Sequence, residues 1–178
     1  MIEILKDPGV LALPQLDPAT LRMDGVALGS PAAGVPRHRI TEAQSSVVAR
    51  YRGGDDIDSE YHDADGRRLT LDEVIDHTVG ADGFLYCAEE LTYKVRAGLV
   101  VGFAVYGAPL ARFAHLTSYE ELLAAFGTPD RVREEGSYGD FEGYGLYYWG
   151  ARKHVKWDAS HRRVTLINVG DFEGNAGP

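Results

Sequence analysis

The sequence has one cysteine, no long apolar run and no cluster of basic residues, and each shortage excludes a class of protein. Because Cys87 is the only cysteine, the chain can form neither an internal disulfide nor a multi-cysteine metal site. The longest apolar run, "AGLVVGFAV", is about half as long as a membrane-spanning helix. The stretch "MIEILKDPGVLALPQLDP" has acids and prolines where a secretion signal has a basic start and an unbroken apolar core. We therefore expect a soluble, cytoplasmic protein.

Acidic residues exceed basic ones, and the formal net charge is −9. Phosphate contacts need clustered Lys and Arg, so the sequence argues against direct nucleic-acid binding and favours a partner with a basic surface. The excess is uneven, since residues 1–107 hold −7 of the −9. Much of it lies in one acidic cluster, formed by Asp55, Asp56, Asp58, Glu60, Asp63 and Asp65.

The first part of the chain predicts an arm followed by strands and one short helix. Prolines at 8, 14 and 18 forbid a continuous helix in residues 1–20, which we expect to lie over the body as an arm. The alternation of apolar and polar residues predicts a strand over 45–53 and a hairpin over 57–70 that turns at Asp65-Gly66. Thr70 as N-cap, Glu73 and Gly80 predict a capped helix, and residues 83–107 read as an antiparallel meander.

The second part repeats this plan. Thr117 or Ser118 caps a predicted helix that ends at Gly127, and four strand-like runs follow it up to Gly170. The composition is sufficient for a packed core, since 44% of the residues are hydrophobic. The predicted fold class is α+β, with an antiparallel sheet in each part.

Two similar sequence segments, called phrases below, suggest an internal repeat: "LGSPAAGV" at 28–35 and "FGTPDRV" at 126–132. Each part also ends in a polar-apolar strand, a turn, a long apolar strand and a Gly. We interpret the chain as an arm (1–20), a first unit (21–107) with an acidic hairpin insertion, and a second unit (108–178). In this predicted tandem duplication, each unit is a short helix packed on an antiparallel sheet, and the two units form one compact body. The alternative is that Gly-x-Pro is a common helix stop and that any two meanders look alike.

A family resemblance follows from "LTSYEELLAAFGTPDRV" and the later "GLYYW". Over residues 116–170 the chain resembles the small bacterial SmpA/BamE-type module, which implies a non-enzymatic α+β binding scaffold. Residues 21–107 match that pattern poorly, and the lipoprotein signal of the family is missing, so its role in outer-membrane assembly is not transferred. Tandem small modules in acidic chains also resemble the immunity proteins that neutralise bacterial polymorphic toxins.

Few residues suggest chemistry. On a helix, the spacing of His154, Asp158 and His161 could bring them together as metal ligands. The surrounding sequence instead predicts a strand, a turn and a second strand, and this arrangement separates the three side chains. Cys87 alternates with Leu85 and is expected to be a buried structural thiol. No nucleotide-binding loop or nucleophile motif occurs, so we expect no catalysis, metal or cofactor.

The acidic cluster has three interpretations. "DADG" loosely resembles a calcium loop, yet with Asp63 at position one the twelfth position is Val74 in place of the required Glu. The cluster is otherwise a solvated hairpin, or a surface that attracts a basic partner.

The segment from Gly136 to Gly145 combines glycines with amphipathic aromatics and acids. This composition is typical of recognition loops, because Tyr offers a large contact area at low entropy cost. It is equally compatible with a mobile β-turn whose aromatics cover the sheet edge. The candidate residues are Tyr138, Asp140, Phe141, Glu142 and Tyr144.

We therefore hypothesise a non-catalytic immunity protein that occludes the active or substrate-binding site of a cognate toxin. The alternatives are a small enzyme or ligand-binding protein using His154, Asp158 or His161, and a structural assembly module.

Overall fold

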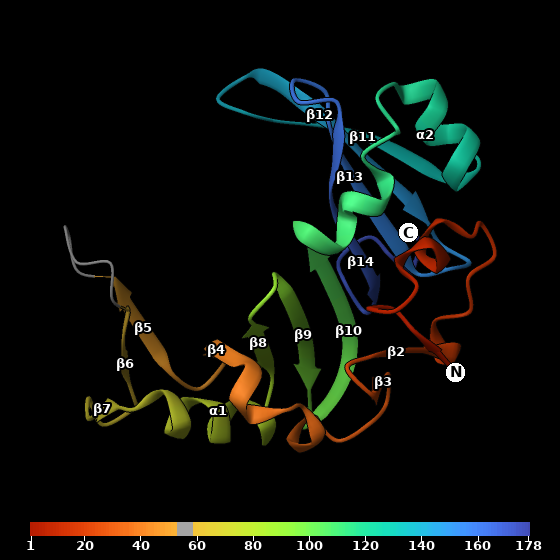
Figure 1. The fold of residues 1–178 in the computed structure, drawn as a ribbon. Coiled ribbons are helices and arrows are strands. Elements are labelled where there is room, and N and C mark those ends of the chain that lie inside the picture. The colour runs from red at the N-terminus through yellow and green to blue at the C-terminus, as the bar shows by residue number, and fades with distance from the viewer. Residues whose placement is uncertain (53–58) are drawn as a thin grey trace.

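One eight-stranded antiparallel sheet dominates the molecule (Figure 1). The computed structural model describes residues 1–52 and 59–178. The strand order is β11-β12-β13-β14-β10-β9-β8-β4. The bounds are β4 (Ile40–Ser45), β8 (Gly83–Cys87), β9 (Leu91–Arg96), β10 (Leu99–Tyr106), β11 (Arg131–Ser137), β12 (Asp140–Tyr148), β13 (Lys153–Asp158) and β14 (Arg163–Gly170).

Smaller elements surround this sheet. One three-stranded sheet contains β1 (Ile2–Glu3), β2 (Leu21–Met23) and β3 (Val26–Ala27), and another contains β5 (Ala49–Arg52), β6 (Ser59–His62) and β7 (Arg68–Leu69). The helices are α1 (Leu71–Val79) and α2 (Tyr119–Phe126). The described residues also form the 3₁₀ segments η1 (Pro8–Ala12), η2 (Pro18–Thr20), η3 (Ala32–Gly34), η4 (Arg37–Arg39) and η5 (Ala108–Phe113). The predicted α+β class is confirmed at this level.

The two parts of the chain meet at a seam between β10 and β14. These strands pair antiparallel, from Gly102 opposite Gly170 to Tyr106 opposite Leu166. On each side of the seam the strand order runs back along the chain, as β10-β9-β8-β4 and as β14-β13-β12-β11. The last strands of residues 21–107 and 108–178 are therefore neighbours within one continuous sheet.

Both predicted helices are confirmed, with their caps. The Thr70 hydroxyl accepts the N–H of Glu73 while the Glu73 carboxylate accepts the N–H of Thr70, which is a capping box. Ser118 and Glu121 form the same arrangement at the start of α2. Each helix then buries one apolar face, with Val74, Ile75 and Thr78 in α1 and Leu122 and Phe126 in α2.

The prediction of one strand over 45–53 is wrong in its first half. Ser45 is the last residue of β4, and the chain turns before β5 begins at Ala49. In the turn, the Ser45 hydroxyl accepts the N–H of Val47 at 3.3 Å, and the Ser46 N–H donates to the carbonyl of Asp82 at 2.9 Å. Hydrogen bonds between serine side chains and the backbone compete in this way with strand pairing. The alternation of apolar and polar residues alone does not reveal this competition.

A buried lysine on β13 holds the segment that contains Leu11 and Leu13 against the body. The Lys153 side chain is fully buried, and its Nζ donates to the carbonyls of Leu11 at 2.9 Å and Leu13 at 3.0 Å. Nζ also lies 5.2 Å from the centre of the Phe126 ring and 4.6 Å from that of Tyr148. Burial lowers the pKa of Lys153 from 10.5 to about 7, because removal from water disfavours the ammonium form.

The glycines of the two Gly-Ser/Thr-Pro segments share a positive φ, but the segments lie in different structural contexts. Gly29 and Gly127 both have positive φ, +83° and +81°. Gly127 ends α2 and donates its N–H to the carbonyl of Leu123, as predicted. Gly29 follows β3 and donates to the carbonyl of Val100 at 2.7 Å. Only the second phrase is a helix stop.

Candidate functional site

The β11–β12 hairpin presents an aromatic side chain at its tip. Tyr138 and Gly139 have φ of +53° and +88°, as the two central residues of a type I′ turn require. This turn matches the strand twist, and the strands pair from Ser137 and Asp140 down to Arg131 and Tyr147, with one register shift between Glu135 and Gly136. The Tyr138 side chain is fully exposed. The loop therefore has the geometry of a regular two-residue hairpin.

Below the tip, Tyr144 is the centre of an aromatic cluster. Its ring centre lies 4.8 Å from that of Tyr119 on α2, 5.0 Å from Phe141 and 6.5 Å from Trp157. Trp157 is buried, whereas Phe141 is 50% exposed. The cluster thus anchors the hairpin to the body and leaves Phe141 and Tyr138 open to a partner. Tyr144 itself mainly packs against its neighbours.

The two predicted acids of this hairpin, Asp140 and Glu142, are exposed. In the described part of the chain, the Asp140 side chain forms no hydrogen bond or ion pair, and the Glu142 carboxylate accepts the hydroxyl of Ser137. Two aromatic side chains and two carboxylates therefore lie within five residues, 138–142, at the free end of the hairpin.

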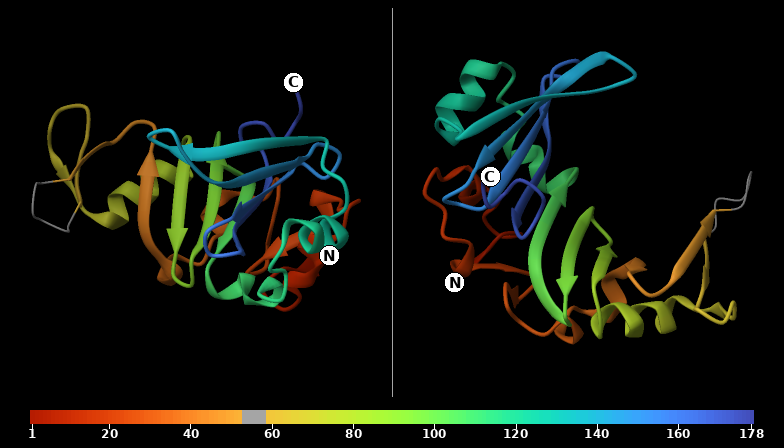
Figure 2. Two further views of the ribbon diagram at one scale, coloured as in Figure 1. Left: turned by 90° about the horizontal axis from the view of Figure 1, so that it is seen from above. Right: turned by 180° about the vertical axis from the view of Figure 1, so that it is seen from behind.

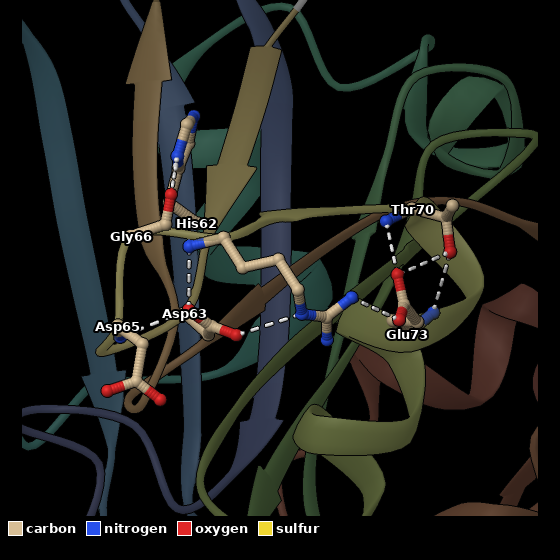
Figure 3. Close-up of polar contacts among 7 residues, drawn as sticks. His62, Asp63, Asp65, Gly66, Thr70 and Glu73 are labelled. Carbon is tan, nitrogen blue, oxygen red and sulfur yellow. Dashed lines mark hydrogen bonds and ion pairs between the residues drawn. The ribbon is translucent and has the colours of Figure 1, made fainter.

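The second candidate surface, the acidic cluster, is partly neutralised by its own arginines (Figure 3). The Asp63 carboxylate accepts the backbone N–H groups of Asp65 at 3.0 Å and Arg67 at 2.9 Å, and also the Arg67 guanidinium at 3.2 Å. These backbone hydrogen bonds, with the nearby Arg67, lower the pKa of Asp63. Arg67 also pairs with Glu73 at 2.8 Å. Asp63 is therefore a structural residue of the turn.

The other acids of the cluster differ in availability. Glu60 forms ion-pair contacts with Arg68 at 3.2 Å and with His62 at 3.4 Å. Asp65 is exposed, and Figure 3 shows its carboxylate directed away from Arg67. Three predicted residues, Asp55, Asp56 and Asp58, lie outside the described residues.

The two hairpins are separate but extend to the same side of the molecule. The β11–β12 hairpin belongs to one edge of the large sheet, while the β5–β6–β7 hairpin follows β4 at the other edge. In Figure 1 and in both views of Figure 2 they stand apart from each other, and both lie toward the same side of the molecule. The structure does not merge the two predicted surfaces into one patch.

His154 belongs to a polar network that the sequence did not reveal. Its Nε2 lies 3.4 Å from Glu135 Oε1 on β11, without hydrogen-bond geometry, and its Nδ1 lies 3.4 Å from Asn168 Nδ2 on β14. Burial lowers the pKa of His154, and the nearby Glu135 opposes this effect only in part. Gly145 is part of the same site, because a Cβ there would lie 2.4 Å from Glu135 Oε1.

Asp158 and His161 do not join His154. The Asp158 carboxylate contacts His161 Nδ1 at 2.8 Å and accepts the backbone N–H groups of Ser160 and His161, which closes the β13–β14 turn. The predicted strand, turn and strand is confirmed. In the described ranges, no group of three or more His, Cys, Asp or Glu side chains is placed to hold a metal ion.

Cys87 is buried, as predicted. Burial raises the pKa of its thiol to about 11, so the reactive thiolate is disfavoured at neutral pH.

Comparison with known proteins assigns no family. No family model matches the chain, and no curated protein or solved structure matches it either. Within residues 1–52 and 59–178, no helix has the length and apolar character needed to cross a membrane.

Proposed function

We propose that this chain is a non-catalytic protein-binding module, and that it acts in the cytoplasm as an immunity protein that neutralises a toxin enzyme. The observation that carries the proposal is the β11–β12 hairpin, whose tip exposes Tyr138 completely and Phe141 by half. Exposed aromatics on a well-paired hairpin are typical of binding hot spots, because their burial gains apolar area at little entropic cost.

The proposed mechanism is occlusion of a basic cleft. Tyr138 and Phe141 supply the apolar contacts, while Asp140, Glu142 and Asp65 are the described acids best placed to meet basic groups. Glu60 and Asp63 already contact Arg68 and Arg67, so they would have to exchange partners to contribute. The net charge of −9 supports electrostatic attraction of a basic partner.

The positions of the β11–β12 hairpin and of the β5–β6–β7 hairpin on one side of the molecule suggest how the chain could cover a cleft. A partner seated against that side would meet the tip of β11–β12 and the β5–β6–β7 hairpin together (Figure 2). Contacts at two separate points restrict orientation more than a single contact does.

We also propose that the chain arose by tandem duplication of a helix-plus-sheet unit. The support is the shared order of strands on both sides of the β10–β14 seam and the shared positive φ of Gly29 and Gly127. The first phrase lacks a preceding helix, and the insertion that contains β5, β6 and β7 has no counterpart in the second part.

The decisive experiment is a pull-down of the product of the adjacent upstream gene, combined with rescue of its toxicity on co-expression. We expect a stable complex and restored growth. If neither complex nor rescue occurs, the proposal is wrong. A complex without rescue would leave a binding module and remove the immunity role.

A further inference from the structure

A cavity of about 540 Å³ opens beside the seam between the two parts of the sheet. It lies between the 3₁₀ segment η5, the end of β10 and the start of β14. Its volume is within the range of small-molecule sites. The lining residues are Glu90, Tyr106, Gly107, Leu110, Ala111, Phe113, Ala114, Arg163, Val164 and Thr165.

One part of the cavity wall is apolar. Leu110, Phe113 and Val164 are nearly completely buried in the protein and line the cavity. Side chains of this kind favour an aliphatic or aromatic group of a ligand, because its transfer from water buries apolar surface.

The position of one charged group, Glu90, is fixed by the backbone. Its Oε2 accepts the N–H of Ala108 at 3.2 Å. The carboxylate also occupies the place where a side chain at position 107 would begin, since a Cβ on Gly107 would lie 1.1 Å from Oε2. Gly107, with φ of +48°, is therefore required for this arrangement.

The β8–β9 turn that presents Glu90 is strained. Glu89 and Glu90 have φ of +64° and +60°, a left-handed conformation that costs about 1–2 kcal/mol for most non-glycine residues. Turns of this kind usually contain Asn-Gly. Strained backbone persists where it positions functional groups, and here the strained residue places a carboxylate at the cavity.

A second charge of opposite sign, Arg163, lines the same cavity. In the described part of the chain, no ion pair engages Arg163 or Glu90, and the two do not pair with each other. The cavity therefore offers a carboxylate, a guanidinium and apolar side chains together.

We propose that this cavity binds a small zwitterion with an apolar group, of the class of apolar α-amino acids. Glu90 receives the ammonium group, Arg163 receives the carboxylate, and Leu110, Phe113 and Val164 contact the apolar side chain. A molecule of this class satisfies all three features, whereas an amine, an acid or a hydrocarbon satisfies fewer. The site is distinct from the β11–β12 hairpin.

The test is a titration of the ¹⁵N-labelled full chain, followed by amide chemical shifts. The probes are L-phenylalanine, L-leucine, N-acetyl-L-phenylalanine, which lacks the ammonium group, and 2-phenylethylamine, which lacks the carboxylate. We expect the two amino acids to shift the amides of Gly107, Ala108 and Thr165. Each truncated probe should bind at least ~10-fold more weakly, since it leaves one charge unpaired.

Variants separate the two charges. Glu90→Gln should bind L-phenylalanine and its N-acetyl derivative equally, and Arg163→Gln should bind L-phenylalanine and 2-phenylethylamine equally. Ala111→Trp fills the cavity while keeping both charges and should abolish binding. Glu173→Gln, an exposed acid outside the cavity, is the matched control and should bind as the unmodified chain does.

Circular dichroism and the thermal midpoint establish that each variant is folded. The proposal is overturned if neither amino acid shifts the cavity amides, or if the unmodified chain binds the N-acetyl probe as well as L-phenylalanine. Unchanged selectivity in folded Glu90→Gln would also overturn it.

Discussion

The side-chain amide of Asn175 donates to Asn168 Oδ1 at 2.8 Å, and this contact determines which way the Asn168 amide faces. The same Asn175 nitrogen reaches the carbonyls of Arg152 and Gly170, which accept hydrogen bonds only, so its identity as the donor is fixed. Asn168 then turns its own NH₂ group toward His154 Nδ1. His154 Nδ1 must accept, and the ring proton lies on Nε2, facing Glu135.

We therefore expect neutral His154 to be the Nε2–H tautomer in long-range ¹H–¹⁵N spectra. Asn168→Asp places a carboxylate beside Nδ1 and should raise the His154 pKa, whereas Asn168→Ala should leave the tautomer mixed. The Nδ1–H tautomer in the unmodified chain would contradict this network.

Because the pKa of His154 is lowered on folding, the unfolded chain binds the proton more readily below about pH 6.5. The contribution of His154 to stability is therefore complete above that pH and is lost as pH falls. Urea denaturation from pH 7.5 to 5 should show a shallower decline in His154→Gln than in the unmodified chain. Parallel declines would show that His154 titrates alike in both states.

Gly145→Ala should destabilise the fold by about 1–3 kcal/mol, because the added Cβ would lie 2.4 Å from Glu135 Oε1 and 2.8 Å from His154 Nε2. Adding Glu135→Ala should restore part of the loss. Gly150→Ala is the matched control, since a Cβ there meets no atom within 4 Å. Equal unfolding free energies for both Ala variants would refute the steric explanation.

Lys153→Met should change how stability depends on pH. Folding lowers the Lys153 pKa from 10.5 to about 7, so between these values the unfolded chain binds more protons and stability rises with pH. Lys153→Met should remove this rise and, by orphaning the carbonyls of Leu11 and Leu13, speed hydrogen exchange in the arm. Lys6→Met, at an exposed position, is the control. A rise that persists in Lys153→Met must come from other groups.

Tyr138→Ala and Phe141→Ala should each weaken binding of the proposed toxin partner by roughly tenfold or more. The thermal midpoint of Tyr138→Ala should change little, because Tyr138 is fully exposed. Leu99→Ala, at another exposed apolar position, should leave affinity unchanged. Calorimetric titration measures all three. Unaltered affinity in both aromatic variants would remove the hairpin from the interface.

Charge reversal at Asp55, Asp56 and Asp58 should slow association with a basic partner and weaken its dependence on salt. Stopped-flow kinetics at several salt concentrations provide the measurement. If the rates match those of the unmodified chain, these acids do not attract the partner.

Local signals in the sequence predicted the elements that depend on neighbours along the chain. Caps, turn residues and the alternation of apolar and polar residues predicted the capping box at Thr70, the start of α2 after Thr117 or Ser118, the turn at Gly66 and the strands of the two meanders. The failure over 45–53 is also local in cause, since a serine side chain diverts the backbone before β5.

Contacts across the sheet could not be predicted, because they depend on register. Glu135, His154 and Asn168 meet only because β11–β12 and β13–β14 each contain a register shift, at Glu135/Gly136 and at Lys156/Trp157. Glu90 and Arg163 likewise share a cavity only through the β10–β14 seam. One feature of the sequence could have pointed to that cavity. Glu89 and Glu90 lie in the turn between β8 and β9, and a tight turn favours Asn-Gly.

The burial of Cys87 makes the molecule convenient to label. As the sole thiol is inaccessible and its pKa is about 11, a cysteine introduced at position 138 would be the one group that reacts with maleimide at neutral pH. A fluorophore attached there would report directly on whether the hairpin tip becomes enclosed when a partner arrives.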